Sequence, residues 1–403
     1  MKYQISFLES KTANLSARQA NQTILLAWRQ LAKARKNLLV SKITIQRGAQ
    51  DLHGHLPQLM GAHRIVVSSL DENLIQCVAY LRAILGICIP FQIHLHGTAH
   101  SGPTFLRGIV PHLQAHDVFV VSSQSEAEVL QLFLSRANLI RIPFLYACSQ
   151  TKARPQGETG SVRFLYVGRL SLQKNVHILL RAFSNLKKRN PETHFEFIVF
   201  GGEDAIGAPE YGIRSLDYGK KLQKIAQNLN LTEVRWMGPA DQKTIDRFIR
   251  SKRHIFVSAS THLGENFGLA AFRSLSLGHP AVLTGWGGHR DLKGYFPQNV
   301  QLVPVSIRGN RPHLKTLDLT RCMEIAMENK SRSPSRQLEK LTRDVSKSLQ
   351  RSLTLRSNAS PLVPTSYYRR LQKRLGSRQR GDGLFGAKNG KMALPLLRIM
   401  AKA

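Results

Sequence analysis

The sequence has 403 residues, of which 42% are hydrophobic and 21% are charged, a composition that supports two domains with cores of their own and argues against extensive disorder. The net charge of +33 favours anionic partners such as nucleic acid, an acidic membrane surface or a phosphorylated substrate, without choosing among them. The four cysteines, at residues 77, 88, 148 and 322, have no C-x-x-C spacing, which argues against structural zinc and fits a reducing cytoplasm.

Over the first 150 residues, strand-like apolar runs alternate with helical patterns, as is typical of βαβ units with parallel sheets. The predicted strands are residues 3–8, 38–45, 62–68, 91–96 and 118–122. The predicted helices are residues 23–36, 74–85 and 125–135. These elements predict a first α/β domain at residues 1–150.

The polar segment 150–161, which contains Pro and Gly and almost no apolar residue, is the best candidate for an interdomain linker. After it, strands are predicted at residues 164–167, 195–200, 234–237, 254–258 and 281–283. Helices are predicted at residues 175–189, 220–229, 242–249 and 267–277. We therefore predict a second α/β domain at residues 151–355. Residues 356–403 are predicted to form a basic C-terminal helix, at residues 367–375, and a tail. In one arrangement left open, this C-terminal segment packs back on the first domain.

The segment after the strand 164–167 carries the first candidate site. Gly168 ends the strand, and a glycine there lets the backbone approach a ligand closely. Arg169 and Lys174 follow on the turn and the helix start, where cations and helix amides together suit a diphosphate. The ordinary alternative is a pair of solvated surface cations.

The segment from Ser258 to Arg273 is more informative, because a glycine-bearing loop opens a helix whose free amides can hold a phosphate. Glu265 lies just before that helix and can accept hydrogen bonds from sugar hydroxyls. The alternative interpretation of Glu265 is an ordinary acidic residue at a helix N-terminus. For Phe267 and Leu269 the alternative is packing in the core. The paired glycines after residue 200 form either a ligand loop or a tight turn.

The order of these segments resembles retaining glycosyltransferases of the family-4 (group 1) type. It runs strand–Gly-Arg-x4-Lys, strand–Gly-Gly, Glu-x-Phe-Gly-Leu, Gly-x-Pro-x-Val and Gly-Gly-x-x-Asp over residues 163–292, with a looser resemblance at residues 90–147. The resemblance implies the GT-B fold, two facing Rossmann-like α/β domains with parallel sheets and an interdomain cleft. One departure is that the loop after residue 8 has no glycine, where such enzymes often have a Gly-rich loop.

The resemblance also implies roles for individual residues. Arg169 and Lys174 would neutralise the leaving diphosphate, and Glu265 would hold sugar hydroxyls. His96 would help place the sugar or the acceptor, with His94 as the alternative and a purely structural role left open. The expected donor-binding residues are Gly168, Gly201, Gly238, Asn266, Phe267, Gly268, Leu269 and Arg273.

Arg273 is the second departure. The family commonly has another glutamate eight residues after the first, which is expected to accept hydrogen bonds from the ribose hydroxyls, whereas arginine can only donate. Four outcomes are open. Arg273 binds a phosphate, the donor sits differently, donor binding has decayed, or the side chain turns outward.

We therefore expect a retaining hexosyltransferase that needs no metal and no cofactor and moves a sugar from a nucleotide-sugar donor to a saccharide or lipid-linked acceptor, in cell-surface polysaccharide or lipopolysaccharide synthesis. The alternative is a catalytically inactive relative that binds sugars or partners. No signal peptide or membrane span is evident, so a cytoplasmic protein, peripheral at the anionic inner face of the cell membrane, is expected. A specific nucleic-acid partner is not expected, since no zinc-finger spacing or aromatic-rich RNA-binding segment is present.

Overall fold

The structure is a computed structural model that describes residues 2–11, 15–97, 106–143, 161–204, 217–329, 333–355, 360–376 and 390–402. The chain separates into two compact units, one made of Met1–Ala147 with Lys340–Arg378 and the other of Cys148–Glu339 with Gln379–Ala403. The predicted linker lies outside the described residues except for Ser161, as does Cys148. The division of the chain at residues 150 and 355 stays a prediction.

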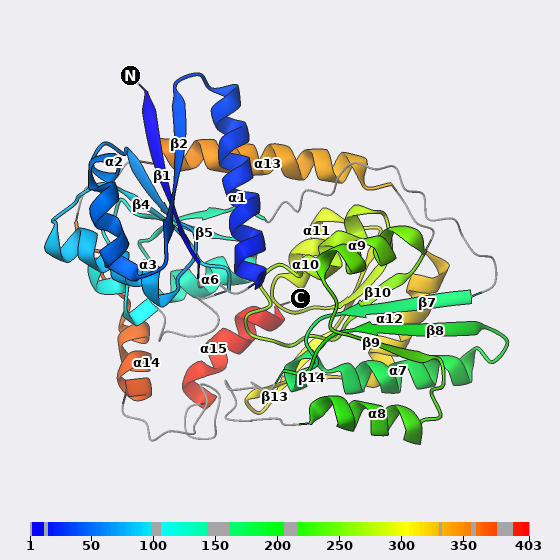
Figure 1. Ribbon diagram of the computed structural model, residues 1–403. Helices are drawn as coiled ribbons and strands as arrows, with labels where there is room; N and C mark the ends of the chain where they lie inside the picture. The colour runs from blue at the N-terminus through cyan, green and yellow to red at the C-terminus, as the bar shows by residue number, and fades with distance from the viewer. Residues whose placement is uncertain are drawn as a thin grey trace. The chain divides into compact units, whose positions relative to one another are not determined.

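The first unit contains a six-stranded parallel sheet in the order β2-β1-β3-β4-β5-β6 (Figure 1). Its strands are β1 (Tyr3–Ser10), β2 (Leu38–Ile45), β3 (Arg64–Val67), β4 (Phe91–His94), β5 (Val118–Val121) and β6 (Asn138–Arg141). Strands β3, β4 and β5 are buried along their whole length, as expected for central strands covered by helices on both faces.

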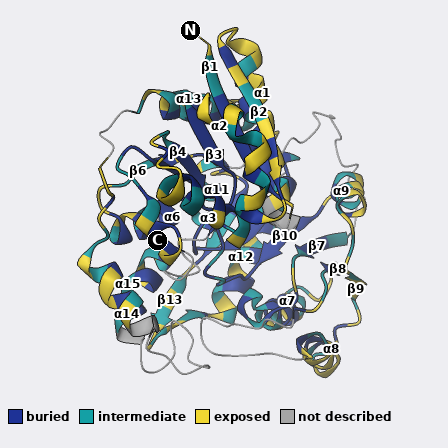
Figure 2. Cartoon of the chain, turned by 60° about the vertical axis from the view of Figure 1, so that its left-hand side comes forward, coloured by how far each residue is buried: buried dark blue, intermediate teal, exposed yellow. Residues whose placement is uncertain are grey.

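Helices surround this sheet. They are α1 (Leu15–Ala34), η1 (Gly48–His55), α2 (Leu56–Met60), α3 (Glu72–Ala79), η2 (Tyr80–Ile84), η3 (Val110–His112), α6 (Gln124–Phe133) and α14 (Ser366–Gly376), together with most of α13 (Ser335–Thr354). Figure 2 shows that buried and exposed residues alternate along α1, as in a helix with one face against the protein and one in solvent. Helix α14 packs on α6, where the Phe133 ring lies 5.3 Å from that of Tyr368, and it confirms the basic helix predicted at residues 367–375.

The second unit has another six-stranded parallel sheet, in the order β12-β11-β10-β7-β8-β9. Its strands are β7 (Ser161–Val167), β8 (His194–Phe200), β9 (Val234–Gly238), β10 (Ile255–Ser258), β11 (Ala281–Thr284) and β12 (Val300–Val303). An antiparallel hairpin of β13 (Val305–Arg308) and β14 (Arg311–Leu314) follows the sheet. The pairing of β7 with both β8 and β10 places the strand that carries Gly168 near the centre of the sheet.

The helices of this unit are η4 (Leu172–Lys174), α7 (Val176–Arg189), α8 (Tyr218–Asn228), α9 (Gln242–Ser251), α10 (Leu269–Ser276), α11 (His289–Tyr295), α12 (Thr316–Glu328) and α15 (Gly390–Ala401). The core between the sheet and α7 is built on the edge-to-face and stacked rings of Phe164, Phe183, Phe195 and Phe197. Each buried ring contributes about 2–3 kcal/mol through its burial, so this core fixes the strands whose ends carry the site.

The predicted α/β fold of two Rossmann-like units with parallel sheets is confirmed. Three helices differ locally from their predicted ranges. The helix predicted at residues 267–277 begins at Leu269, because Gly268 adopts a left-handed φ of +74° as its N-cap. The helix predicted at residues 74–85 changes to π-helical hydrogen bonding at Tyr80. The helix predicted at residues 23–36 already begins at Leu15. No helix in the described ranges combines the length and apolar character needed to cross a bilayer.

Candidate functional site

The loops at the carboxyl edge of the second sheet are joined by backbone hydrogen bonds. The Leu170 amide donates to the Gly202 carbonyl at 2.8 Å, and the Gly201 amide donates to the Gly238 carbonyl at 2.9 Å. A side chain at Gly201 would collide with the carbonyl oxygen of Gly168, so these two loops touch backbone to backbone. The glycines predicted at the donor site therefore lie together at one edge, where ligands bind in open parallel sheets.

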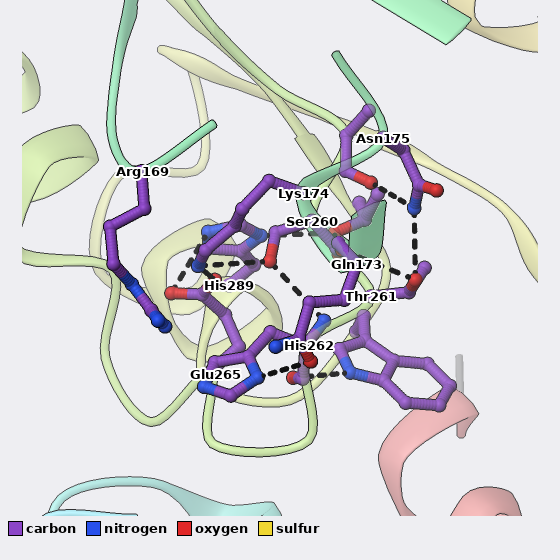
Figure 3. Close-up of polar contacts among 12 residues, drawn as sticks. Arg169, Gln173, Lys174, Asn175, Ser260, Thr261, His262, Glu265 and His289 are labelled. Atoms are coloured by element: carbon purple, nitrogen blue, oxygen red, sulfur yellow. Dashed lines mark hydrogen bonds and ion pairs between the residues drawn. The ribbon is translucent and has the colours of Figure 1, made fainter. Parts of the chain in front are cut away.

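Glu265 lies in the loop after β10, and its buried carboxylate is the centre of the site (Figure 3). Its Oε2 accepts a hydrogen bond from Lys174 Nζ at 2.6 Å, and the same ammonium donates to Ser260 Oγ at 3.2 Å. Burial alone would raise the pKa of the Glu265 carboxyl, but Lys174 and the neighbouring His289 outweigh it and hold the pKa well below its usual range. Glu265 is therefore ionised and fixed in place.

His289 approaches the other oxygen of Glu265, with Nε2 3.6 Å from Oε1. Thr284 Oγ1 donates its single hydrogen to the Ser260 carbonyl at 2.6 Å and therefore accepts from His289 Nδ1 at 3.0 Å. Burial lowers the pKa of His289, against the attraction of Glu265, so the ring is neutral near pH 7. Nε2 and Oε1 are then two adjacent acceptors, and such a pair matches a hydroxyl donor between them.

Arg169 differs from Lys174, since its side chain is 47% exposed. Its guanidinium forms an ion pair with the buried carboxylate of Asp204, which follows β8. In Figure 3 the guanidinium lies to one side of the Lys174–Glu265 pair. The site therefore contains one ammonium held by Glu265 and one guanidinium with an exposed surface available to an anion.

The loop between Glu265 and α10 is tightly packed. A side chain on Gly288 would collide with the Asn266 carbonyl, and a Cβ on Gly268 would lie 2.8 Å from Cδ2 of His289. The Phe267 ring is buried 5.2 Å from that of Phe272. This side chain therefore packs in the core, which was the alternative to a ligand-binding role. What the loop offers a ligand is its backbone, at the N-terminus of α10.

Arg273 is buried, and its Nη1 donates to Oε1 of Gln242, the first residue of α9. The amide of Gln242 in turn donates to Asp246 Oδ1 at 2.6 Å. The outward orientation considered for Arg273 is therefore wrong. The side chain reaches from α10 to the first residue of α9.

In the first unit, His96 follows β4 with a left-handed φ of +22°, an unusual conformation for a non-glycine residue. Its Nε2 lies 2.8 Å from Asn21 Oδ1 and 2.6 Å from the Ser68 carbonyl, two acceptors that require a hydrogen on this nitrogen. Burial lowers the pKa of His96 to about 4, so the ring is neutral. His94 is completely buried, whereas His96 is partly exposed, so His96 is the better placed of the two to meet a ligand.

Sequence reasoning missed four members of the site, Ser260, Thr284, Asp204 and His289. His289 follows the Gly-Gly pair after β11, and that glycine turn was the one available signal. Among the residues that the structure describes, no three His, Cys, Asp or Glu side chains gather in a way that could hold a metal ion.

Comparisons with known proteins find a family likeness over residues 149–294. Residues 149–294 match the family model described as "Glycosyl transferases group 1". The D-inositol 3-phosphate glycosyltransferase of Corynebacterium jeikeium is 29% identical over 124 residues, which is 30% of this chain and 27% of that protein. The match thus spans about a quarter of this curated relative. The resemblance predicted from the ordered segments is confirmed.

Solved structures extend the likeness to most of the chain. A lipopolysaccharide outer core galactosyltransferase, WaaB, in its apo form superposes with a TM-score of 0.63 at 13% identity, over 87% of this chain and 99% of that one. A trehalose-6-phosphate protein from E. coli bound with UDP-2-fluoro glucose gives a TM-score of 0.55 at 9% identity, over 90% of this chain and 100% of that one. The fold is that of GT-B glycosyltransferases.

Proposed function

We propose that this group 1 glycosyltransferase-like protein transfers a hexose from a nucleotide-sugar donor to a saccharide or lipid-linked acceptor, with retention of configuration and without a metal ion. The observation that carries the proposal is the buried Glu265 carboxylate between Lys174 and His289. A family match over residues 149–294 supports the reaction class. The metal-independent chemistry is supported by two cations, Arg169 and Lys174, at the sheet edge where a diphosphate would bind.

In this proposal the diphosphate of the donor lies at the N-terminus of α10 and against the exposed side of Arg169. Lys174 stands between this anion and Glu265, so its ammonium can follow the negative charge that develops on the leaving phosphate. Glu265 and His289 offer adjacent acceptors to hydroxyls of the sugar. His96 of the first unit would contact the sugar or the attacking acceptor.

The acceptor and the location are proposed on separate grounds. Helix α13 exposes Arg336, Lys340, Arg343, Lys347 and Arg351, and Leu341, Val345 and Leu349 are buried. A row of exposed cations on one helix suits an anionic lipid surface, where lipid-linked acceptors reside. The WaaB likeness is compatible with a role in lipopolysaccharide or other cell-surface polysaccharide synthesis at the cytoplasmic side of the membrane.

The direct test is release of nucleoside diphosphate by the purified full chain from UDP-glucose, UDP-galactose, UDP-N-acetylglucosamine and GDP-mannose, with and without EDTA. We expect slow hydrolysis of one donor, unchanged by EDTA, since donors are commonly hydrolysed when the acceptor is absent. No release from any donor, with no thermal shift by UDP, GDP or ADP, would refute the enzyme. It would favour the inactive, sugar- or partner-binding alternative, for which the buried Arg273 is the motivating feature.

A further inference from the structure

Helix α15 packs within the second unit, against the β13–β14 hairpin. It buries Ala393, Leu396, Leu397 and Met400, which recur at helical spacing on one face. Arg398 on the same helix is exposed. The helix is therefore anchored by an apolar face of its own, more than 100 residues along the chain from the loops of the site.

The C-terminal end of α15 is hydrogen-bonded to the turn that follows β11. The last carbonyls of a helix have no partner within it. Here the Met400 carbonyl accepts from the Gly287 amide at 3.0 Å, and the Ile399 carbonyl accepts from Arg290 Nη1 at 3.0 Å. Residues 287–290, called the 287–290 turn below, are thus tied to α15 at both of their ends.

The 287–290 turn is also the segment that contacts Glu265. The Gly288 amide donates to the Glu265 carbonyl at 2.8 Å, and the His289 ring faces the Glu265 carboxylate. Packing leaves the turn little freedom, because a Cβ on Gly287 would lie 2.7 Å from Met400 Cε and would also collide with the Glu265 carbonyl. A shift of the turn would therefore move both the backbone and the side-chain partner of Glu265.

We propose that α15 supports the site by fixing the position of the 287–290 turn. Arg290 is a positioning residue that, through this turn, keeps His289 in place relative to Glu265. The inference rests on the proposed function in that it assigns Glu265 and His289 to the sugar end of the donor. Arg290 itself acts through the turn and has no assigned contact with substrate. Its guanidinium donates to a carbonyl in the last turn of α15, where helix carbonyls have no partner within the helix.

The test compares Arg290→Met with Arg398→Met, a matched substitution at the exposed arginine of the same helix. We expect Arg290→Met to speed hydrogen exchange at the Gly287 and Gly288 amides at least tenfold and to lower kcat for donor hydrolysis about tenfold, because small displacements of catalytic groups are costly. The affinity for UDP should stay within twofold, since UDP lacks the transferred hexose that would meet Glu265. Arg398→Met should change none of these quantities.

Arg290→Lys is the conservative variant, because lysine can still donate to the Ile399 carbonyl, and it should recover most of the exchange protection and of kcat. If Arg290→Met unfolds, Met400→Ala tests the contact from the α15 side, because it removes the side chain that packs beside Gly287. Unchanged amide exchange in the variants, or unchanged kcat in an active protein, would overturn the proposal that α15 supports the site. If the wild type uses no donor at all, the proposed function fails, and the exchange measurement by itself decides whether α15 holds the turn.

Discussion

Glu265 and Arg273 lie eight residues apart, one in the loop before α10 and the other within α10, and their surroundings differ in kind. Glu265 is a buried charge with a charged partner, Lys174, and a neutral ring beside it. Arg273 is also buried, but its Nη1 donates a hydrogen bond to the neutral side-chain amide of Gln242. In the proposed function, the sugar end of the site is thus organised around an ionised hydrogen-bond acceptor, and the other end around a hydrogen-bond donor. The two ends can therefore be tested separately.

The largest effect is expected at the Glu265 end, from Lys174→Ala. Loss of the ammonium should lower donor turnover about 10²- to 10³-fold, because one stabilising cation is removed from the developing diphosphate charge. The variant should also lose about 3 kcal/mol of stability, since it leaves the Glu265 carboxylate buried without its partner.

A double variant, Lys174→Met with Glu265→Gln, separates the two consequences. It removes both charges, so thermal unfolding should return towards that of the wild type while turnover stays low. Turnover of the single variant within a factor of a few of wild type would remove Lys174 from the proposed chemistry.

The next effect concerns the acid stability of a histidine pair that contacts the residue after Arg273. His254 and His279 are stacked with ring centroids 3.9 Å apart, and His254 Nε2 lies 3.0 Å from Ser274 Oγ on α10. Burial lowers the pKa of His279 from 6.5 to about 4, so below pH 6.5 the unfolded chain binds the proton more readily than the folded one. The contribution of neutral His279 to the free energy of unfolding is fully present above about pH 6.5 and declines toward pH 4. At pH 5 the free energy of unfolding is lower by about 2 kcal/mol because of this ring.

Denaturant unfolding at pH 7 and pH 5 measures this loss. His279→Gln keeps an amide that can donate to the Ile249 carbonyl but does not titrate, so its unfolding free energy should depend less steeply on pH. Equal pH dependence in the variant and the wild type would show that His279 contributes nothing to the acid sensitivity.

A smaller effect is expected from Arg273→Glu, which restores an acceptor at the ribose end. If the ribose hydroxyls lie near residue 273, UDP should bind about tenfold more tightly, because hydrogen bonds to a charged group are worth roughly 1.5–3 kcal/mol. Arg273→Gln is the matched control that removes the positive charge without adding a negative one. Isothermal titration with UDP measures both, and weaker binding by the glutamate variant would mean that the donor sits differently.

The smallest effect is expected at Asp204. Asp204→Asn removes the charge that neutralises Arg169, so the affinity for UDP should rise about two- to threefold, as is typical of a partly exposed ion pair. Titration at low and high salt should show the gain only at low salt. A loss of affinity would indicate that Asp204 orients Arg169 rather than competing for it.

Sequence reasoning recovered those parts of the molecule that are encoded locally. The alternation of apolar runs predicted five of the six strands in each described sheet and missed β6 and β12. Arg169, Lys174 and Glu265 stood out because each follows a strand at family-like spacing. The contacts of His289 with Glu265 and of Arg273 with Gln242 join residues 24 and 31 positions apart, and no local pattern reports such pairs. The hairpin β13–β14 and helix α12 were also missed, in a segment for which no elements were predicted.

The glycines of the site have a consequence for mutational tolerance. At Gly201 and Gly288 the obstacle to a side chain is a backbone carbonyl, of Gly168 and Asn266 respectively, which no change of a neighbouring side chain can move aside. Gly294, by contrast, has nothing within 4 Å of its would-be Cβ. In a saturation library we expect substitutions of Gly201 and Gly288 not to be tolerated, and not to be rescued by second-site mutations. Substitutions of Gly294 should be tolerated. The loops of the site can therefore change chemistry through their side chains but not through their main-chain path.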